Sequence, residues 1–220
     1  MALHQTSTTM SPSAESTLAG STSGTIEAAT RPPVVLASAS PRRLDLLRQI
    51  GLEPDRVDPP EINENHARTE LPRAYARRMA EEKLAVAAAR HPGAIVIAAD
   101  TVVACGRRIL PKAETEQQAR ACLKLLSGRR HQVWGGIAVA LPDGRQISRL
   151  VETDVILKRL EPNEIDRYIA SGEWHGKAGG YAIQGRAAAF IRSIAGSYSN
   201  VVGLSLSDLA AMLHGNGVVW

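Results

Sequence analysis

The chain has little cysteine, few aromatic residues and no long apolar run. Among its 220 residues there are two cysteines and one phenylalanine, and aromatic residues make up 4%. Cys105 and Cys122 are too few for a disulfide framework or a cysteine-rich zinc site, so we expect reduced thiols. No apolar run approaches the roughly 20 residues that cross a bilayer, so no membrane association is expected. Aliphatic residues and alanine must fill the core.

Neither positively nor negatively charged residues dominate the sequence. The 26 Lys and Arg residues outnumber the 22 Asp and Glu residues, which gives a formal net charge of +4. This mild excess suits an anionic ligand. The dense basic blocks and exposed-type aromatic residues of nucleic-acid-binding modules are missing, so we expect no nucleic-acid partner.

Composition divides the chain into a tail and one domain. Residues 1–32 are crowded with Ser and Thr and carry few charges, so they are predicted to be a disordered extension. They lack the basic start and apolar stretch of a secretory signal and the arginines of a transit peptide. We therefore expect a cytoplasmic protein whose folded domain spans residues 33–220.

The folded domain alternates short apolar runs with segments of helical periodicity. Strands are predicted over residues 34–37, 94–98, 132–141 and 146–157, and helices over residues 41–49, 71–90, 115–126, 162–170 and 207–213. Pro142-Asp143-Gly144 has the composition of a hairpin turn between the two long strands. This order predicts an α/β fold with a mixed, twisted sheet and flanking helices.

The segment from Ser38 to Arg43 joins the first strand to the first helix. Ser40 is a natural N-cap, and Pro41 fits the first helical position. Arg42 and Arg43 in the first turn oppose the helix dipole, which is more favourable if an anion such as a phosphate chain binds there. The alternative is a capped helix with two solvated arginines, and local sequence leaves both open.

Two acidic positions could hold a metal ion. Asp100 is predicted to end a buried strand beside Thr101, where clefts form in α/β sheets and where a carboxylate can hold Mg²⁺ against phosphates. Glu64 belongs to an acidic loop, residues 61–64. Each could equally be an ordinary turn or loop residue.

Separated lysines and a glycine-rich stretch complete the candidates. Lys83, Lys112 and Lys177 are point charges that could neutralise phosphate oxygens, although most lysines of this kind are simply on the surface. Residues 176–185 allow close backbone approach to a ligand, and Gln184 offers a donor and an acceptor. A flexible loop is the alternative. Together these features weakly support a metal-assisted phosphoanhydride hydrolase.

In this order, the segments resemble the Maf family of nucleoside-triphosphate pyrophosphatases over residues 34–213. The resemblance is carried by residues 36–43, Glu82-Lys83, residues 99–101, residues 126–128 with His131, residues 171–173, residues 177–185 and residues 196–204. It implies a Maf/ITPase-like fold with two lobes around a cleft, usually dimeric. The implied reaction cleaves the α–β phosphoanhydride bond of a nucleoside triphosphate with Mg²⁺ or Mn²⁺, releasing monophosphate and pyrophosphate and removing non-standard or excess nucleotides.

The resemblance also implies a role for each candidate residue. Glu64 and Asp100 would hold the metal and orient a water, one of them acting as the base, while Lys83 and Lys112 would offset developing charge. The implied substrate-binding residues are Ser38, Ser40, Arg42 and Arg43 for the phosphates, and Thr101 and Gln184 for the nucleoside.

The stretch from Tyr181 to Gly185 resembles members that act on dTTP and UTP. A sister group that prefers 7-methyl-GTP has an acidic residue where Gln184 stands. The alternatives are therefore a 7-methyl-GTP pyrophosphatase, or a non-enzymatic regulator of cell division or septum formation, a role linked to the family. Three departures from the family pattern are Asn63 in place of an acidic residue, Pro111-Lys112-Ala113 in place of Gly-Lys-Pro, and Ser205 in place of proline.

Overall fold

One mixed sheet organises the described part of the protein, residues 31–220 of a computed structural model. The strands are β1 (Val34–Ala37), β2 (Arg56–Val57), β3 (Ile95–Cys105), β4 (Arg108–Leu110), β5 (Lys112–Ala113), β6 (Arg130–Ala140), β7 (Gln146–Leu157), β8 (Lys177–Ala178) and β9 (Ile191–Ala195). The helices are α1 (Pro41–Gln49), α2 (Pro72–Arg90), α3 (Glu116–Leu126), α4 (Pro162–Ala170), α5 (Tyr198–Val202) and α6 (Leu206–His214), with a 3₁₀-helix at Arg186–Phe190. The predicted disorder of residues 1–32 falls almost wholly outside the described residues.

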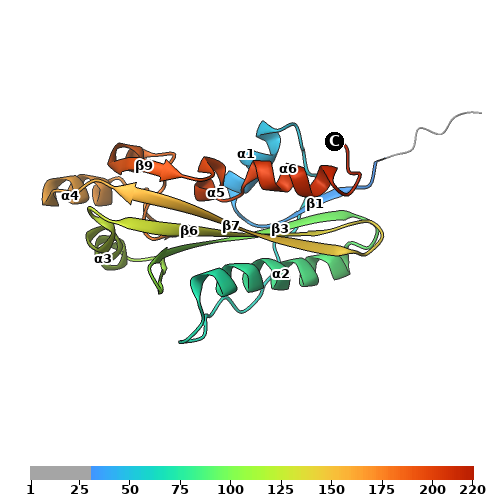
Figure 1. Ribbon diagram of the computed structural model, residues 1–220, viewed down its shortest axis with the longest axis horizontal. Coiled ribbons are helices and arrows are strands. Elements are labelled where there is room, and N and C mark those ends of the chain that lie inside the picture. The colour runs from blue at the N-terminus through green and yellow to red at the C-terminus, as the bar shows by residue number, and fades with distance from the viewer. Residues whose placement is uncertain (1–30) are drawn as a thin grey trace, which may run out of the picture. The chain divides into compact units, whose positions relative to one another are not determined.

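The sheet has seven strands in the order β2-β1-β3-β6-β7-β9, and β4 also pairs with β3. Strands β2, β1 and β3 are parallel, whereas β4, β6, β7 and β9 pair antiparallel to their neighbours. Helix α2 covers one face, and α1, α5 and α6 cover the other (Figure 1). Helices α3 and α4 lie at the end of β6 and β7 that is far from the β6–β7 turn (Figure 1). Strands β5 and β8 form a separate two-stranded ribbon, and β5 contacts α3. The predicted α/β class with a mixed sheet is confirmed.

Local signals placed most helices correctly. Proline occupies the first position of α1, α2 and α4, where its missing N–H costs no hydrogen bond. Thr115 caps α3 by accepting from the Gln118 backbone, and the Gln118 side chain accepts from Thr115 in return. In the turn between β6 and β7, Gly144 has a φ of +85°, which favours glycine.

The prediction that Asp100 ends a strand is wrong. Strand β3 continues to Cys105 because β6 pairs with it from Val96 to Ala104. On the other side of β3, pairing with β1 ends at Ala98 and pairing with β4 begins at Val103. Within the described residues, the edge of β3 between these two partners has no paired strand. Asp100 therefore lies beside the carboxyl end of β1, in the middle of β3.

Two glycines let other elements approach β6 closely. Gly136 lies opposite Asp100 in the sheet, and a Cβ atom there would be 2.1 Å from the Ala76 backbone oxygen of α2. A Cβ atom on neighbouring Gly135 would be 1.9 Å from Asn200 Oδ1. Glycine inside a strand often marks such close contact. Here it allows α2 to pack against the sheet next to Asp100.

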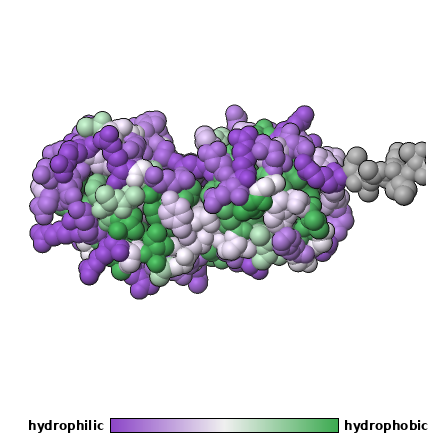
Figure 2. All heavy atoms as spheres, turned by 90° about the horizontal axis from the view of Figure 1, so that it is seen from above, coloured by the Kyte–Doolittle hydropathy of each residue, from purple (hydrophilic) through white to green (hydrophobic). Residues whose placement is uncertain are grey.

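The face of the molecule seen in Figure 2 shows no large continuous apolar patch. On the face seen in Figure 2, hydrophilic residues surround separate apolar patches, as on most protein surfaces. None of the helices within residues 31–220 is long and apolar enough to cross a membrane.

His131 on β6 makes the stability of this fold depend on pH. Its side chain is fully buried, Nε2 lies 2.8 Å from the Tyr181 hydroxyl, and Nδ1 has no hydrogen-bond partner among residues 31–220. Burial lowers the pKa of His131 from 6.5 to about 4. The unfolded chain therefore binds this proton at a higher pH than the folded protein. The stabilisation is complete above pH 6.5 and is lost as the pH falls toward 4.

We expect the free energy of unfolding to fall by about 2 kcal/mol between about pH 7.5 and pH 5 because of this histidine. Urea denaturation at both pH values measures the change. His131→Gln should lose most of that pH dependence, whereas His175→Gln, at an exposed position, should retain it. Equal pH dependence in all three proteins would contradict the assignment.

Candidate active site

A cavity of about 350 Å³ lies at the unpaired edge of β3. All ten residues predicted to form the site line it: Ser38, Ser40, Arg42, Arg43, Glu64, Lys83, Asp100, Thr101, Lys112 and Gln184. Ten positions spread over about 150 residues of sequence therefore converge on one cavity. Their individual roles stay predictions.

On the α2 side of the sheet, two acids share one lysine. Lys83 Nζ lies 2.6 Å from Asp100 Oδ1 and 2.7 Å from Glu64 Oε1. Lys112 Nζ lies 2.5 Å from the other oxygen of Glu64. Asp100 and Lys83 are 5% and 7% exposed, so this half of the cluster is largely removed from water, whereas Glu64 and Lys112 lie at its open side. Both lysines are already neutralised by acids of the site.

Helix α2 also holds the loop that carries Glu64. The Tyr75 hydroxyl donates a hydrogen bond to the Glu64 backbone oxygen (2.6 Å), and Arg78 donates to the Asn65 backbone oxygen and to the Glu70 carboxylate. Partial burial acts to raise the pKa of Glu64, but hydrogen bonds from Lys112 and Lys83 outweigh it and lower the pKa to about 2. Glu64 is therefore a fixed negative charge and a weak base.

On the opposite face, Arg43 ties three segments together. Its guanidinium donates to Ser38 Oγ (2.8 Å), Thr101 Oγ1 (3.1 Å) and the Gly203 backbone oxygen (2.9 Å). The side chain is buried, and burial lowers its pKa, with Asp100 opposing that shift. Arg43 thus joins the residue after β1, strand β3 and the end of α5, and it lines the cavity.

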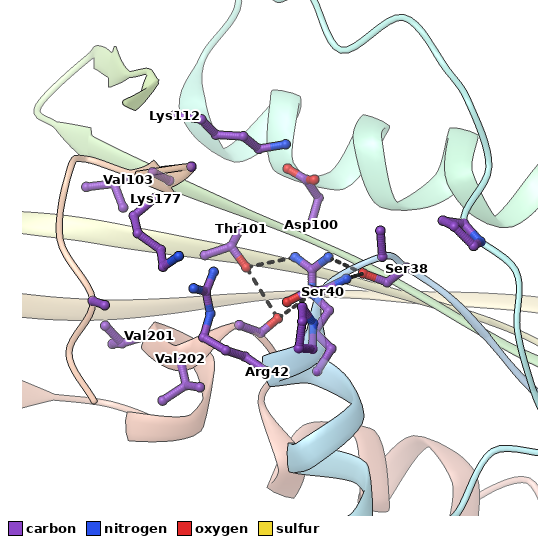
Figure 3. Close-up of a pocket in the computed structure, with 18 of the residues that line it drawn as sticks. Ser38, Ser40, Arg42, Asp100, Thr101, Val103, Lys112, Lys177, Val201 and Val202 are labelled. Carbon is purple, nitrogen blue, oxygen red and sulfur yellow. Dashed lines mark hydrogen bonds between the residues drawn. The ribbon is translucent and has the colours of Figure 1, made fainter. Parts of the chain in front are cut away.

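Ser40 and Arg42 lie at the N-terminus of α1. Ser40 occupies the predicted N-cap position, but its side chain makes no capping hydrogen bond. Its backbone oxygen accepts from the N–H groups of Arg43 and Leu44, and its own N–H donates to Ser38 Oγ (3.3 Å). Arg42 is half-buried and points into the cavity (Figure 3). The two adjacent arginines therefore differ: Arg43 is bonded within the protein, and Arg42 faces the space where a ligand would bind.

Gln184 is exposed at the rim, on a loop held from behind by Glu173. The Glu173 carboxylate accepts a hydrogen bond from the Arg186 backbone (2.7 Å). It also fills the place of a side chain at Gly185, where a Cβ atom would lie 2.0 Å from Glu173 Oε2. These contacts fix the backbone that directly follows Gln184.

Metal donors in the cavity are the two carboxylates. Within the described chain, no group of three or more His, Cys, Asp or Glu side chains is arranged to hold a metal ion. Two carboxylates beside a cationic cavity do fit Mg²⁺, which commonly binds through one or two carboxylates together with substrate phosphates.

Tyr75, Arg78, Glu173 and Gly136 support the site, and none of them was given a role from the sequence. Two had a signal: Glu173 lies in the segment 171–173 that carries the family resemblance, and Gly136 belongs to a glycine pair inside an apolar strand. Tyr75, Arg78 and Glu173 act through contacts between segments that are distant in sequence or through backbone atoms, which no local pattern reveals.

The fold and cavity define an α/β protein whose pocket is lined by basic side chains and contains a carboxylate pair. Residues 33–216 match the family described as Maf-like protein. The chain is 63% identical to dTTP/UTP pyrophosphatase from Paramagnetospirillum magneticum, over 84% of this chain and 97% of the relative, and 60% identical to dTTP/UTP pyrophosphatase from Caulobacter vibrioides, over 84% and 96%. A solved HAM1 protein from Coxiella burnetii is similar with a TM-score of 0.46 and 17% identity, over 84% of this chain and 99% of that chain. The chain belongs to the Maf family.

We expect Arg43→Lys to destabilise the protein by about 1–3 kcal/mol, because a lysine cannot reach all three acceptors and leaves buried polar groups unpaired. Urea denaturation measures the loss. Arg48→Lys is the matched control on the same helix, since Arg48 forms an exposed pair with Glu53, and it should leave stability unchanged. If Arg43→Lys were as stable as the wild type, Arg43 would not be the structural link between these segments.

Proposed function

We propose that the protein hydrolyses dTTP and UTP to the nucleoside monophosphate and pyrophosphate. The observation that carries this proposal is the carboxylate pair of Glu64 and Asp100, held by Lys83 inside a cavity lined by five basic side chains. The carboxylates can orient a water molecule, and the positively charged side chains can stabilise negative charge on the phosphates. The relatives named dTTP/UTP pyrophosphatase, at 60–63% identity, support the same reaction and substrates.

The triphosphate would bind along the first turn of α1. A helix N-terminus presents free N–H groups and a partial positive charge, which together bind phosphate. Ser38, Ser40 and Arg42 line this part of the cavity. Arg43 donates to Ser38 Oγ and so holds this part of the cavity in place. We therefore assign Arg43 a positioning role and Arg42 direct contact with phosphate.

Of the two acids, Asp100 is the better candidate for the base. Glu64 accepts from both Lys83 and Lys112, which holds its pKa near 2 and makes it a poor proton acceptor. Asp100 pairs with Lys83 alone. Asp100 would therefore take the proton of the attacking water, and Glu64 would keep its charge and hold Lys83 and Lys112 in place.

A divalent cation, Mg²⁺ or Mn²⁺, would be held by Glu64 and Asp100 together with phosphate oxygens. When bound, it would polarise the phosphoryl group and offset charge that develops during hydrolysis. Lys83 and Lys112 provide positive charge at the same place.

The nucleoside would be selected by Gln184, with Thr101 nearby. A neutral amide both donates and accepts, which suits the edge of a pyrimidine base. The Thr101 hydroxyl already donates to the Gly203 backbone oxygen (3.3 Å) and accepts from Arg43, so Gln184 carries most of this selection. Assembly as a homodimer, which the family resemblance implies, and a cytoplasmic location, which the composition predicts, stay predictions.

We expect the purified full-length protein with Mg²⁺ to release pyrophosphate from dTTP and UTP, and Asp100→Asn to lower kcat by about 100-fold or more. The assay compares dTTP, UTP, CTP, GTP and 7-methyl-GTP. Asp143→Asn, at the exposed hairpin turn, serves as the control and should keep full activity. Turnover of 7-methyl-GTP alone would overturn the substrate assignment. No turnover of any nucleotide would favour the regulatory role.

We expect Gln184→Glu to shift the ratio of kcat/KM for UTP and GTP toward GTP by about tenfold, because a carboxylate accepts from the donor-rich edge of guanine and repels pyrimidine acceptors. Steady-state kinetics with both substrates measures the ratio. Gln146→Glu adds the same charge at the far end of β7 and should leave the ratio unchanged. An unaltered ratio in Gln184→Glu would remove Gln184 from the selection of the base.

A further inference from the structure

The five cations of the cavity fall into two groups. Lys83 and Lys112 are paired with Glu64 and Asp100, and Arg43 is bonded to three segments of the protein. Within residues 31–220, Arg42 and Lys177 form no ion pair, although both line the cavity. Three cations of the site therefore have no acid partner among the described residues. The guanidinium of Arg43 is bonded to neutral groups of the protein, and Arg42 and Lys177 face the cavity.

Lys177 reaches the cavity from the ribbon of β5 and β8. Ala113 of β5 is its partner in register, and Lys112 lies next along the same ribbon. Both lysines therefore reach the cavity from a single two-stranded unit, from opposite faces of that ribbon. Gly179 follows β8 and packs against Val103 of β3. Its φ is +69°, and a Cβ atom on Gly179 would be 2.7 Å from Val103 Cγ1. This close packing holds the ribbon against the sheet.

The side chains of Lys177 and Arg42 approach each other from opposite walls (Figure 3). The ammonium group of Lys177 donates to the His175 backbone oxygen at 3.1 Å, which leaves further donors for a ligand. Burial lowers the pKa of Lys177, and the charge of Arg42 adds to the shift. Two like charges held together in a half-buried space are unfavourable until an anion binds between them.

We propose that Lys177, together with Arg42 and the N-terminus of α1, binds the diphosphate end of the substrate, which leaves as pyrophosphate. This inference rests on the proposed function for the identity of the substrate. Hydrolysis at the α-phosphorus requires the oriented water, and therefore Glu64 and Asp100, to lie beside that atom. The β- and γ-phosphates carry most of the negative charge, so they occupy the part of the cavity whose cations have no acid partner.

The arrangement separates two tasks of the cations. Lys112 acts near the carboxylates, and Lys177 on the adjacent strand holds the departing group. The β5–β8 ribbon therefore spans the bond that is cleaved. Inorganic pyrophosphate should bind to the free enzyme through Lys177, whereas the nucleoside monophosphate should bind independently of it.

The test measures binding of sodium pyrophosphate and of dTMP to the full-length protein by isothermal titration calorimetry. We expect Lys177→Met to raise the Kd for pyrophosphate by about tenfold or more, as loss of a hydrogen bond to a charged group implies, and to leave the Kd for dTMP within about twofold. Lys177→Arg should restore most of the affinity for pyrophosphate. Lys124→Met, at an exposed position on α3, is the control and should bind both ligands normally.

Three outcomes would overturn the proposal: unchanged pyrophosphate binding in Lys177→Met, weakened binding of dTMP alone, or no pyrophosphate binding by the wild type. The steady-state counterpart is a higher KM for dTTP at similar kcat. If the wild type hydrolysed no nucleotide yet bound pyrophosphate through Lys177, the proposed function would fail and the diphosphate site would stand. Unchanged thermal unfolding of Lys177→Met verifies that the variant is folded.

Discussion

The position of the Lys83 ammonium between two carboxylates is the contact on which the site depends. Two acids in one cavity repel each other, and each loses hydration, so a cation between them is needed to hold them close together. Lys83 supplies that cation from α2, and it joins a loop, a helix and a central strand through one group. Buried ion pairs seldom add much stability, because desolvation offsets their attraction. The value of this cluster is that it fixes the positions of Glu64 and Asp100 and keeps Glu64 charged.

The sheet makes this contact possible through a break in its pairing. Asp100 and Thr101 are consecutive residues of β3, so their side chains point to opposite faces. One meets Lys83 of α2, and the other meets Arg43 of α1. A fully paired β3 would separate these two faces. Because β1 stops at Ala37 and β4 begins later along β3, groups from both faces line a single cavity.

Periodicity and turn chemistry predicted α1 and α4 with the observed bounds and the other long helices to within about two residues, since prolines, caps and glycines act locally. The candidate residues also converge as expected. The sequence could not show that Asp100 lies inside a strand, because the extent of β3 depends on its pairing with β6. Nor could it separate Arg42 from Arg43, or show that Lys83 and Lys112 are neutralised, since those properties arise from partners 17 to 160 residues away.

The distribution of charge explains how one cavity can hold both acids and a polyanion. A triphosphate approaching Glu64 and Asp100 alone would be repelled, and a cavity of cations alone would bind phosphate without activating water. Here the acids are balanced by Lys83 and Lys112, and the excess positive charge lies on Arg43, which is bonded within the protein, and on Arg42 and Lys177, which face the cavity. The attraction for phosphate is thus displaced from the carboxylates toward α1 and the β5–β8 ribbon. Binding there aligns the triphosphate so that its α-phosphorus, rather than its terminal one, meets the carboxylates, which accounts for release of pyrophosphate instead of phosphate.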